Sequence, residues 1–72
     1  MEPWKLRLIA EYAELKDRHE KLCAMLGKLS AGTLEFTPDC PAELLRKQER
    51  AMELYLQCLE ERALYEKVTL PK

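Results

Sequence analysis

An uninterrupted heptad stripe in the first half of the chain is the feature that most constrains its fold. Its members recur at alternating intervals of four and three residues: Leu8, Tyr12, Leu15, His19, Leu22, Leu26 and Leu29. On a helix this spacing keeps one seam facing a partner for about 32 Å, because each residue adds about 1.5 Å. The stripe predicts a helix over residues 3–29, with Pro3 in its first turn, where the missing N–H costs nothing.

The second half of the chain predicts another helix, over residues 41–67. Its inner stripe is predicted to consist of Leu45, Gln48, Met52, Tyr55, Leu59 and Arg62. A further apolar set is predicted to lie away from this stripe: Leu54, Leu56, Ala63 and Leu64. Apolar residues on so much of the circumference exceed what one hairpin can bury, which indicates assembly with other chains.

These segments predict an all-α fold in which two long antiparallel helices form a single helical-hairpin domain over residues 1–72. Residues 30–40 form the loop, and a short tail follows residue 67. A chain of 72 residues buries only about 60% of its unfolded surface, so we expect a homo-oligomeric bundle to supply the missing stability. The predicted seam or oligomer residues are Leu8, Tyr12, Leu15, His19, Leu22, Gln48, Met52, Tyr55 and Leu59.

Composition excludes several functional classes. The net charge is −1, so the chain lacks the excess of basic residues that is typical of proteins that bind DNA or RNA polymers. The sequence has no apolar run near 18 residues and no secretion-signal core, so we expect no membrane span and a cytoplasmic protein. Three cysteines argue against a disulfide framework, since one would be left over.

Enzyme signatures are also missing: the chain has no Gly-rich phosphate loop, no Gly-x-Ser-x-Gly and no His-Glu-x-x-His. We therefore expect no enzymatic activity and no cofactor. His19 and Cys23 lie four residues apart and could supply two metal ligands. Closure of a site would need two more, so the sequence favours core packing for this pair and predicts no metal.

Three polar residues, His19, Gln48 and Arg62, occupy predicted stripe positions where leucine would be more stabilising. Buried polar groups need partners, so these residues could hydrogen-bond one another and fix the helix register. Alternatively, Arg62 could lie at a frayed helix end with its head in water. A third interpretation is that the polar residues line a pocket for an anionic ligand.

The first turn of the predicted N-terminal helix combines Trp4 with Lys5 and Arg7. An aromatic ring beside two cations suits a nucleobase and its phosphate, through stacking and charge-assisted hydrogen bonds. The simpler interpretation, which the sequence alone favours, is that Trp4 fastens the start of the helix to a partner.

Several ordered stretches, taken together, resemble the small phage and prophage helical-hairpin family of anti-CBASS sponges. CBASS is cyclic-oligonucleotide-based antiphage signalling. The stretches are residues 7–15 (RLIAEYAEL), 17–22 (DRHEKL), 36–41 (FTPDCP), 44–48 (LLRKQ), 51–56 (AMELYL) and 59–63 (LEERA). They cover most of both predicted helices.

This resemblance implies a homo-hexamer of hairpins with ligand pockets between protomers. It implies that the protein binds cyclic dinucleotides, and in some members cyclic trinucleotides, without cleaving them. Lys21 corresponds to a ligand-contacting lysine, and Arg7 and Arg62 to candidate phosphate contacts. The base-stacking aromatic position of the family falls near Leu6, so Trp4 or Tyr12 could stack instead, or the ligand could be a different cyclic nucleotide.

Two functions from different classes follow from these observations. The first is a phage-type anti-defence protein that sequesters cyclic oligonucleotide messengers and so blocks activation of host immune effectors. The alternative is a small helical module that inhibits a host protein through an apolar helix face made of Leu54, Leu56 and Leu64.

Overall fold

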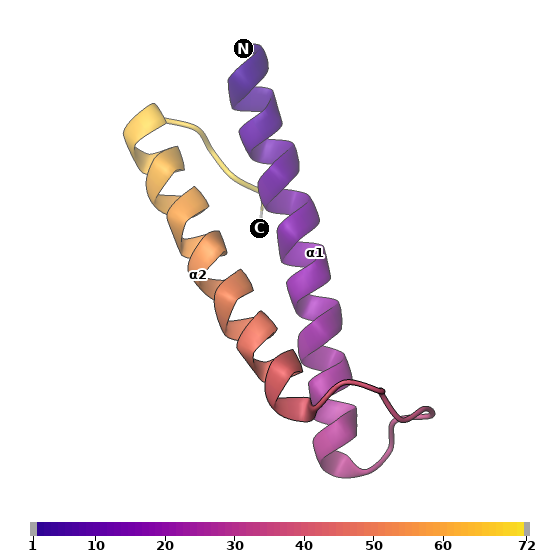
Figure 1. Cartoon of the computed structure of the whole chain (residues 1–72). Helices are drawn as coiled ribbons and strands as arrows, with labels where there is room; N and C mark the ends of the chain where they lie inside the picture. The colour runs from indigo at the N-terminus through magenta and orange to yellow at the C-terminus, as the bar shows by residue number, and fades with distance from the viewer. Residues whose placement is uncertain (1, 72) are drawn as a thin grey trace.

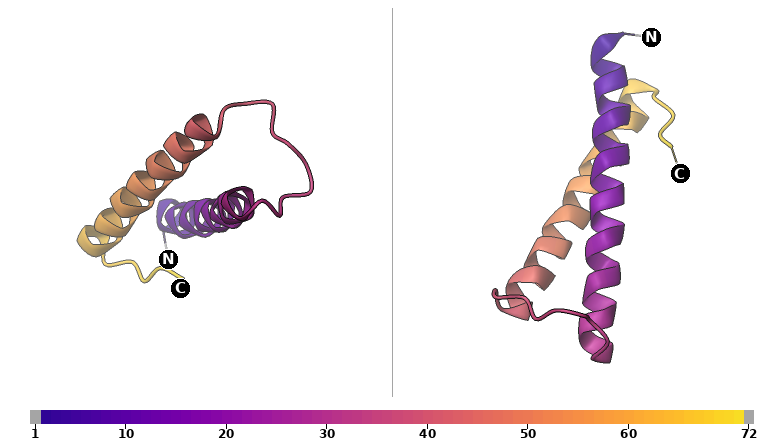
Figure 2. Two further views of the ribbon diagram at one scale, coloured as in Figure 1. Left: turned by 90° about the horizontal axis from the view of Figure 1, so that it is seen from below. Right: turned by 90° about the vertical axis from the view of Figure 1, so that its right-hand side faces the viewer.

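Two helices that pack against each other form the fold, in a computed structural model that describes residues 2–71. The first helix, α1, spans Pro3–Ala31, and the second, α2, spans Ala42–Glu66. They run antiparallel and cross at an angle, and the tail after α2 turns back toward α1 (Figures 1 and 2). The predicted all-α hairpin is confirmed, and residues 2–71 contain no strand.

Backbone hydrogen bonds end both helices in the same way. Gly32 takes a left-handed conformation with φ of 74°, and the N–H of Thr33 donates to the Lys28 carbonyl at 2.9 Å. After α2, Lys67 has φ of 56°, and the Val68 N–H donates to the Ala63 carbonyl at 2.9 Å. This is the Schellman pattern, which satisfies otherwise unpaired carbonyls and redirects the chain. At Gly32 this pattern leads the chain from α1 into the loop, and at Lys67 it leads the chain from α2 into the tail.

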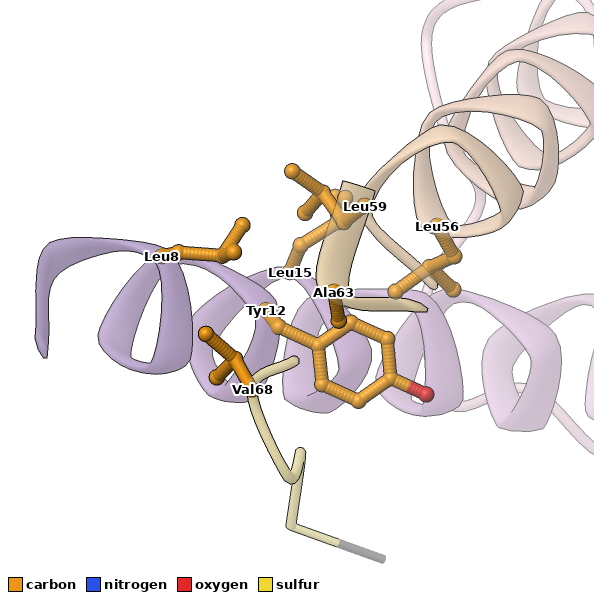
Figure 3. Packing of buried hydrophobic residues seen from close by; sticks show 7 residues of the cluster. All are labelled: Leu8, Tyr12, Leu15, Leu56, Leu59, Ala63 and Val68. Carbon is orange, nitrogen blue, oxygen red and sulfur yellow. The ribbon is translucent and has the colours of Figure 1, made fainter. Parts of the chain in front are cut away.

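The core occupies one half of the hairpin, where the start of α1 meets the end of α2. Leu8 and Leu59 are each only 1% exposed. Figure 3 shows them with the other buried residues, including Val68 from the tail beside Tyr12 and Ala63. The full cluster is Leu8, Tyr12, Leu15, Leu56, Leu59, Ala63 and Val68. The loop-proximal half of the same seam is only half-buried at Leu22, Leu26, Leu29 and Leu45.

The inner face of α2 differs from the predicted stripe at every second position. Leu45, Met52 and Leu59 face α1 as predicted, but Gln48, Tyr55 and Arg62 are exposed. The residue that follows each of them is half-buried or buried instead: Glu49, Leu56 and Ala63. The prediction of Gln48, Tyr55 and Arg62 as hairpin seam residues is therefore wrong.

The tail adds to the core on the side of α2 that this rotation turns inward. Val68 is 8% exposed within the core, and Leu70 packs against the same cluster. Leu56 and Ala63 belong to this cluster, so α1 and the tail together bury the apolar face that they form. Leu56 and Ala63, predicted to face away from the seam, are thus core residues.

Candidate ligand-binding surface

The first turn of α1 arranges an indole and a cation next to each other. Trp4 is half-buried, and its Nε1 donates a hydrogen bond to Glu2 Oε2 at 2.6 Å. Lys5 Nζ lies 5.5 Å from the centre of the Trp4 ring. Leu6 is 55% exposed, and Arg7 is exposed next to it. An aromatic face and two cations are thus available here to an anionic, ring-containing ligand.

Lys21 lies two turns beyond the α1 core residues on an exposed surface. Its Nζ forms an ion pair with Asp17 Oδ2 at 2.9 Å. An exposed pair of this kind contributes only about 0.3–0.5 kcal/mol. Asp17 therefore holds the Lys21 ammonium only weakly.

One hairpin does not gather the predicted ligand-binding residues into one pocket. Arg7 and Lys21 lie on the same helix, and the helical rise separates them by about 21 Å. Arg62 is exposed near the end of α2. Within residues 2–71, Arg7 and Arg62 form no salt bridge. A small ligand that contacts all three cations would have to lie between chains.

A cross-helix hydrogen bond that the sequence did not predict joins Tyr12 to Glu60. The Tyr12 hydroxyl donates to Glu60 Oε2 at 2.8 Å, while the ring belongs to the core. This hydrogen bond, followed by burial and by the negative charge of Glu60, raises the pKa of Tyr12 above its ordinary value of 10.0. Each of these effects favours the protonated phenol.

We expect this raised pKa to make stability fall at alkaline pH. Above about pH 10 the unfolded chain loses the Tyr12 proton while the folded chain keeps it, so unfolding becomes more favourable as pH rises. The Tyr12→Phe variant should lose about 0.5–1.5 kcal/mol at pH 7 and then show a shallower decline above pH 10. Urea unfolding of both proteins from pH 7 to 11 measures this; parallel pH profiles would contradict it.

His19 also has a partner that the sequence did not predict. Its Nε2 lies 2.8 Å from Glu49 Oε2 across the helix pair, and the Cys23 Sγ lies 3.6 Å from the same nitrogen. Within the hairpin, His19 therefore meets neither Gln48 nor Arg62, because α2 turns Glu49 inward instead. Glu49 follows directly after Gln48, which was predicted to face α1. The predicted stripe did not include Glu49 because it assigned α2 a different rotation.

The Cys23 thiol is not activated by this environment. Burial raises the pKa of Cys23, and the carboxylates of Glu49, Glu53 and Glu20 raise it further. A nucleophilic cysteine needs the opposite surroundings, which stabilise the thiolate. These surroundings therefore favour the protonated thiol of Cys23.

No helix within residues 2–71 combines the length and the apolarity that crossing a bilayer requires. Together, these features define a small all-α protein, an antiparallel helical hairpin with uncovered apolar residues and with cations along its outside. The chain belongs to the Sequestin family, whose model, described as Sequestin, matches residues 2–65. The name of this family suggests a sequestering role. No curated protein and no solved structure matches this chain.

Proposed function

We propose that this protein binds and sequesters cyclic oligonucleotide second messengers without cleaving them. It would act as a phage-type anti-defence protein, since messengers held by it cannot activate the immune effectors of the host cell. The observation that carries the proposal is membership of the Sequestin family across residues 2–65. The resemblance of both helices to anti-CBASS sponges supplies the ligand class.

Assembly of several copies follows from the same proposal. Large apolar side chains remain exposed on the hairpin: Leu6, Phe36, Leu44, Leu54, Tyr55, Leu64 and Tyr65. Contact with further copies would cover such residues, and the resemblance points to a homo-hexamer. Gln48 and Tyr55, exposed in the hairpin, stay predicted oligomer residues. Arg7, Lys21 and Arg62 would then converge on a phosphate from different protomers.

Sequestration makes modest chemical demands on such a pocket. It has to offer cations to the phosphates and a flat surface to a base, and Trp4 with Leu6 beside it would provide that surface. A sponge needs affinity and abundance rather than turnover. Free messenger then falls in proportion to the number of occupied pockets.

Native mass spectrometry with a panel of nucleotides tests this function. The panel comprises cyclic dinucleotides, cyclic trinucleotides and nicotinamide-derived cyclic nucleotides. We expect a symmetric oligomer that carries intact nucleotide, with the adduct mass naming the ligand. An assembled protein with no adduct across the panel would contradict the proposal.

Substitution of single cations tests the site assignment. Lys21→Ala and Arg62→Ala should each weaken binding of that ligand about tenfold or more, because a hydrogen bond to a charged group contributes about 1.5–3 kcal/mol. Lys47→Ala, which removes another exposed cation on α2, is the matched control and should bind normally. Calorimetry at equal oligomer concentration measures this, and unchanged affinity in both variants would remove these residues from the site.

A protein-binding function is the second candidate, and the exposure of Leu54 (62%) and Leu64 (79%) favours it. Leu56 no longer belongs to this face because it is buried. This function predicts that a host protein copurifies with the tagged chain and that Leu64→Glu abolishes the copurification. If Leu64→Glu lowers the oligomer mass instead, the face joins copies of this chain.

A further inference from the structure

Three side chains with metal-binding atoms converge at the middle of the hairpin, outside the proposed nucleotide surface. His19 and Cys23 are one turn apart on α1, and Glu49 reaches them from α2. One nitrogen, one sulfur and one carboxylate oxygen all lie within 4.8 Å of one another. His19 and Glu49 are half-buried, while Cys23 is exposed and gives access from solvent.

The two distances from His19 Nε2 are close to those around a tetrahedral zinc ion. Zinc bonds of about 2.0–2.1 Å to a histidine nitrogen and about 2.3 Å to a thiolate place those two atoms about 3.5 Å apart. The His19 Nε2 and Cys23 Sγ atoms are 3.6 Å apart. Nitrogen and carboxylate oxygen would be about 3.3 Å apart on such an ion. The 2.8 Å between His19 Nε2 and Glu49 Oε2 needs to open only slightly.

The charges around the cluster favour a dication. The carboxylates of Glu49, Glu53 and Glu20 place negative charge around the Cys23 sulfur. The same field attracts a divalent cation, which replaces the thiol proton and neutralises the thiolate. His19 would ligate as a neutral imidazole through Nε2, with its proton on Nδ1.

We propose that His19 Nε2, Cys23 Sγ and a carboxylate oxygen of Glu49 bind one Zn²⁺ per chain, with a water molecule as the fourth ligand. The thiol proton goes to solvent on binding. Because the ligands come from both helices, the ion fastens α1 to α2 where the buried core ends. On the loop side of the ion, the seam is only half-buried at Leu22, Leu26 and Leu45. The zinc ion would add a link between α1 and α2 next to this weakly packed part.

Titration of the reduced protein with Co²⁺, an optical probe for zinc sites, tests this site without any nucleotide. We expect a thiolate-to-cobalt charge-transfer band that saturates at one Co²⁺ per chain and disappears when Zn²⁺ is added. Cys23→Ser should lose the band. Cys58→Ser, the matched control at an exposed thiol on α2, should keep it. No band in the unmodified protein, or a band that survives in Cys23→Ser, would overturn the proposal.

Glu49→Gln tests whether the site joins the two helices. This variant keeps the shape of the side chain but removes its charge, and circular dichroism verifies that it folds. We expect Co²⁺ affinity to fall at least about tenfold and the rise in Tm caused by Zn²⁺ to disappear. Unchanged affinity would show that α2 contributes no ligand and would overturn the cross-helix site. Neither experiment depends on nucleotide binding, so this proposal and the sponge function fail separately.

Discussion

Replacing Leu59 with alanine is expected to lower the free energy of unfolding by about 2–5 kcal/mol. Leu59 is 1% exposed and belongs to the one cluster that holds α1, α2 and the tail together. Truncation leaves a cavity between the helices and removes apolar burial. In a chain of this size the loss is a large part of the total, since domains are stable by only about 0.05–0.15 kcal/mol per residue. Urea unfolding followed by circular dichroism, at equal chain concentrations, measures the change.

Leu64→Ala is the matched control for Leu59→Ala. Leu64 is 79% exposed on the same helix, so in the hairpin this change should alter the unfolding free energy by no more than about 0.5 kcal/mol. If Leu64→Ala costs as much as Leu59→Ala, stability resides in contacts between copies and the hairpin core is not its main source.

A negative charge at Leu56 should unfold the hairpin. Leu56 is 8% exposed in the core, so Leu56→Glu buries a carboxylate in an apolar cluster, at a cost of about 3–5 kcal/mol. Glu60, one turn further along α2, accepts the Tyr12 hydrogen bond, and its charge would add repulsion. Loss of helical circular dichroism and of a cooperative thermal transition is the expected result.

Tyr55→Glu is the informative control, because the sequence pattern alone placed Tyr55 rather than Leu56 in the seam. Tyr55 is 44% exposed, so a glutamate there keeps its hydration and the hairpin should stay folded. The reverse outcome, with Tyr55→Glu unfolded and Leu56→Glu folded, would show that α2 has the rotation that its heptad spacing predicted. Circular dichroism of the two variants side by side distinguishes these results.

The inward face of α1 could be predicted from the sequence because one stripe carries most of its large apolar residues. Leu8, Tyr12 and Leu15 are buried, and the rest of the stripe is half-buried. The opposite face is charged, so no other rotation of this helix would bury comparable apolar area. The Asp17–Lys21 pair also follows from sequence, since residues four apart are neighbours on a helix.

The cations at Arg7, Lys21 and Arg62 were chosen by resemblance, and the fold of one chain does not bring them together. They are exposed, so intrachain packing imposes no shared site on them. Their convergence, as proposed, depends on contacts between chains. The His19–Glu49–Cys23 cluster is different, because contact between α1 and α2 within one chain creates it.

The sequence by itself determined two long helices, their antiparallel pairing and the face of α1 that turns inward. The inward face of α1 follows because only one rotation of this helix buries its apolar stripe. Only the tertiary structure decided the rotation of α2. Apolar residues cover so much of that helix that Tyr55 and Leu56 were both acceptable inward positions. In the observed rotation, Leu56 packs in the same cluster as Val68 and Leu70 of the tail, and Glu49 reaches His19. Such contacts join residues far apart in the chain, so no local pattern encodes them.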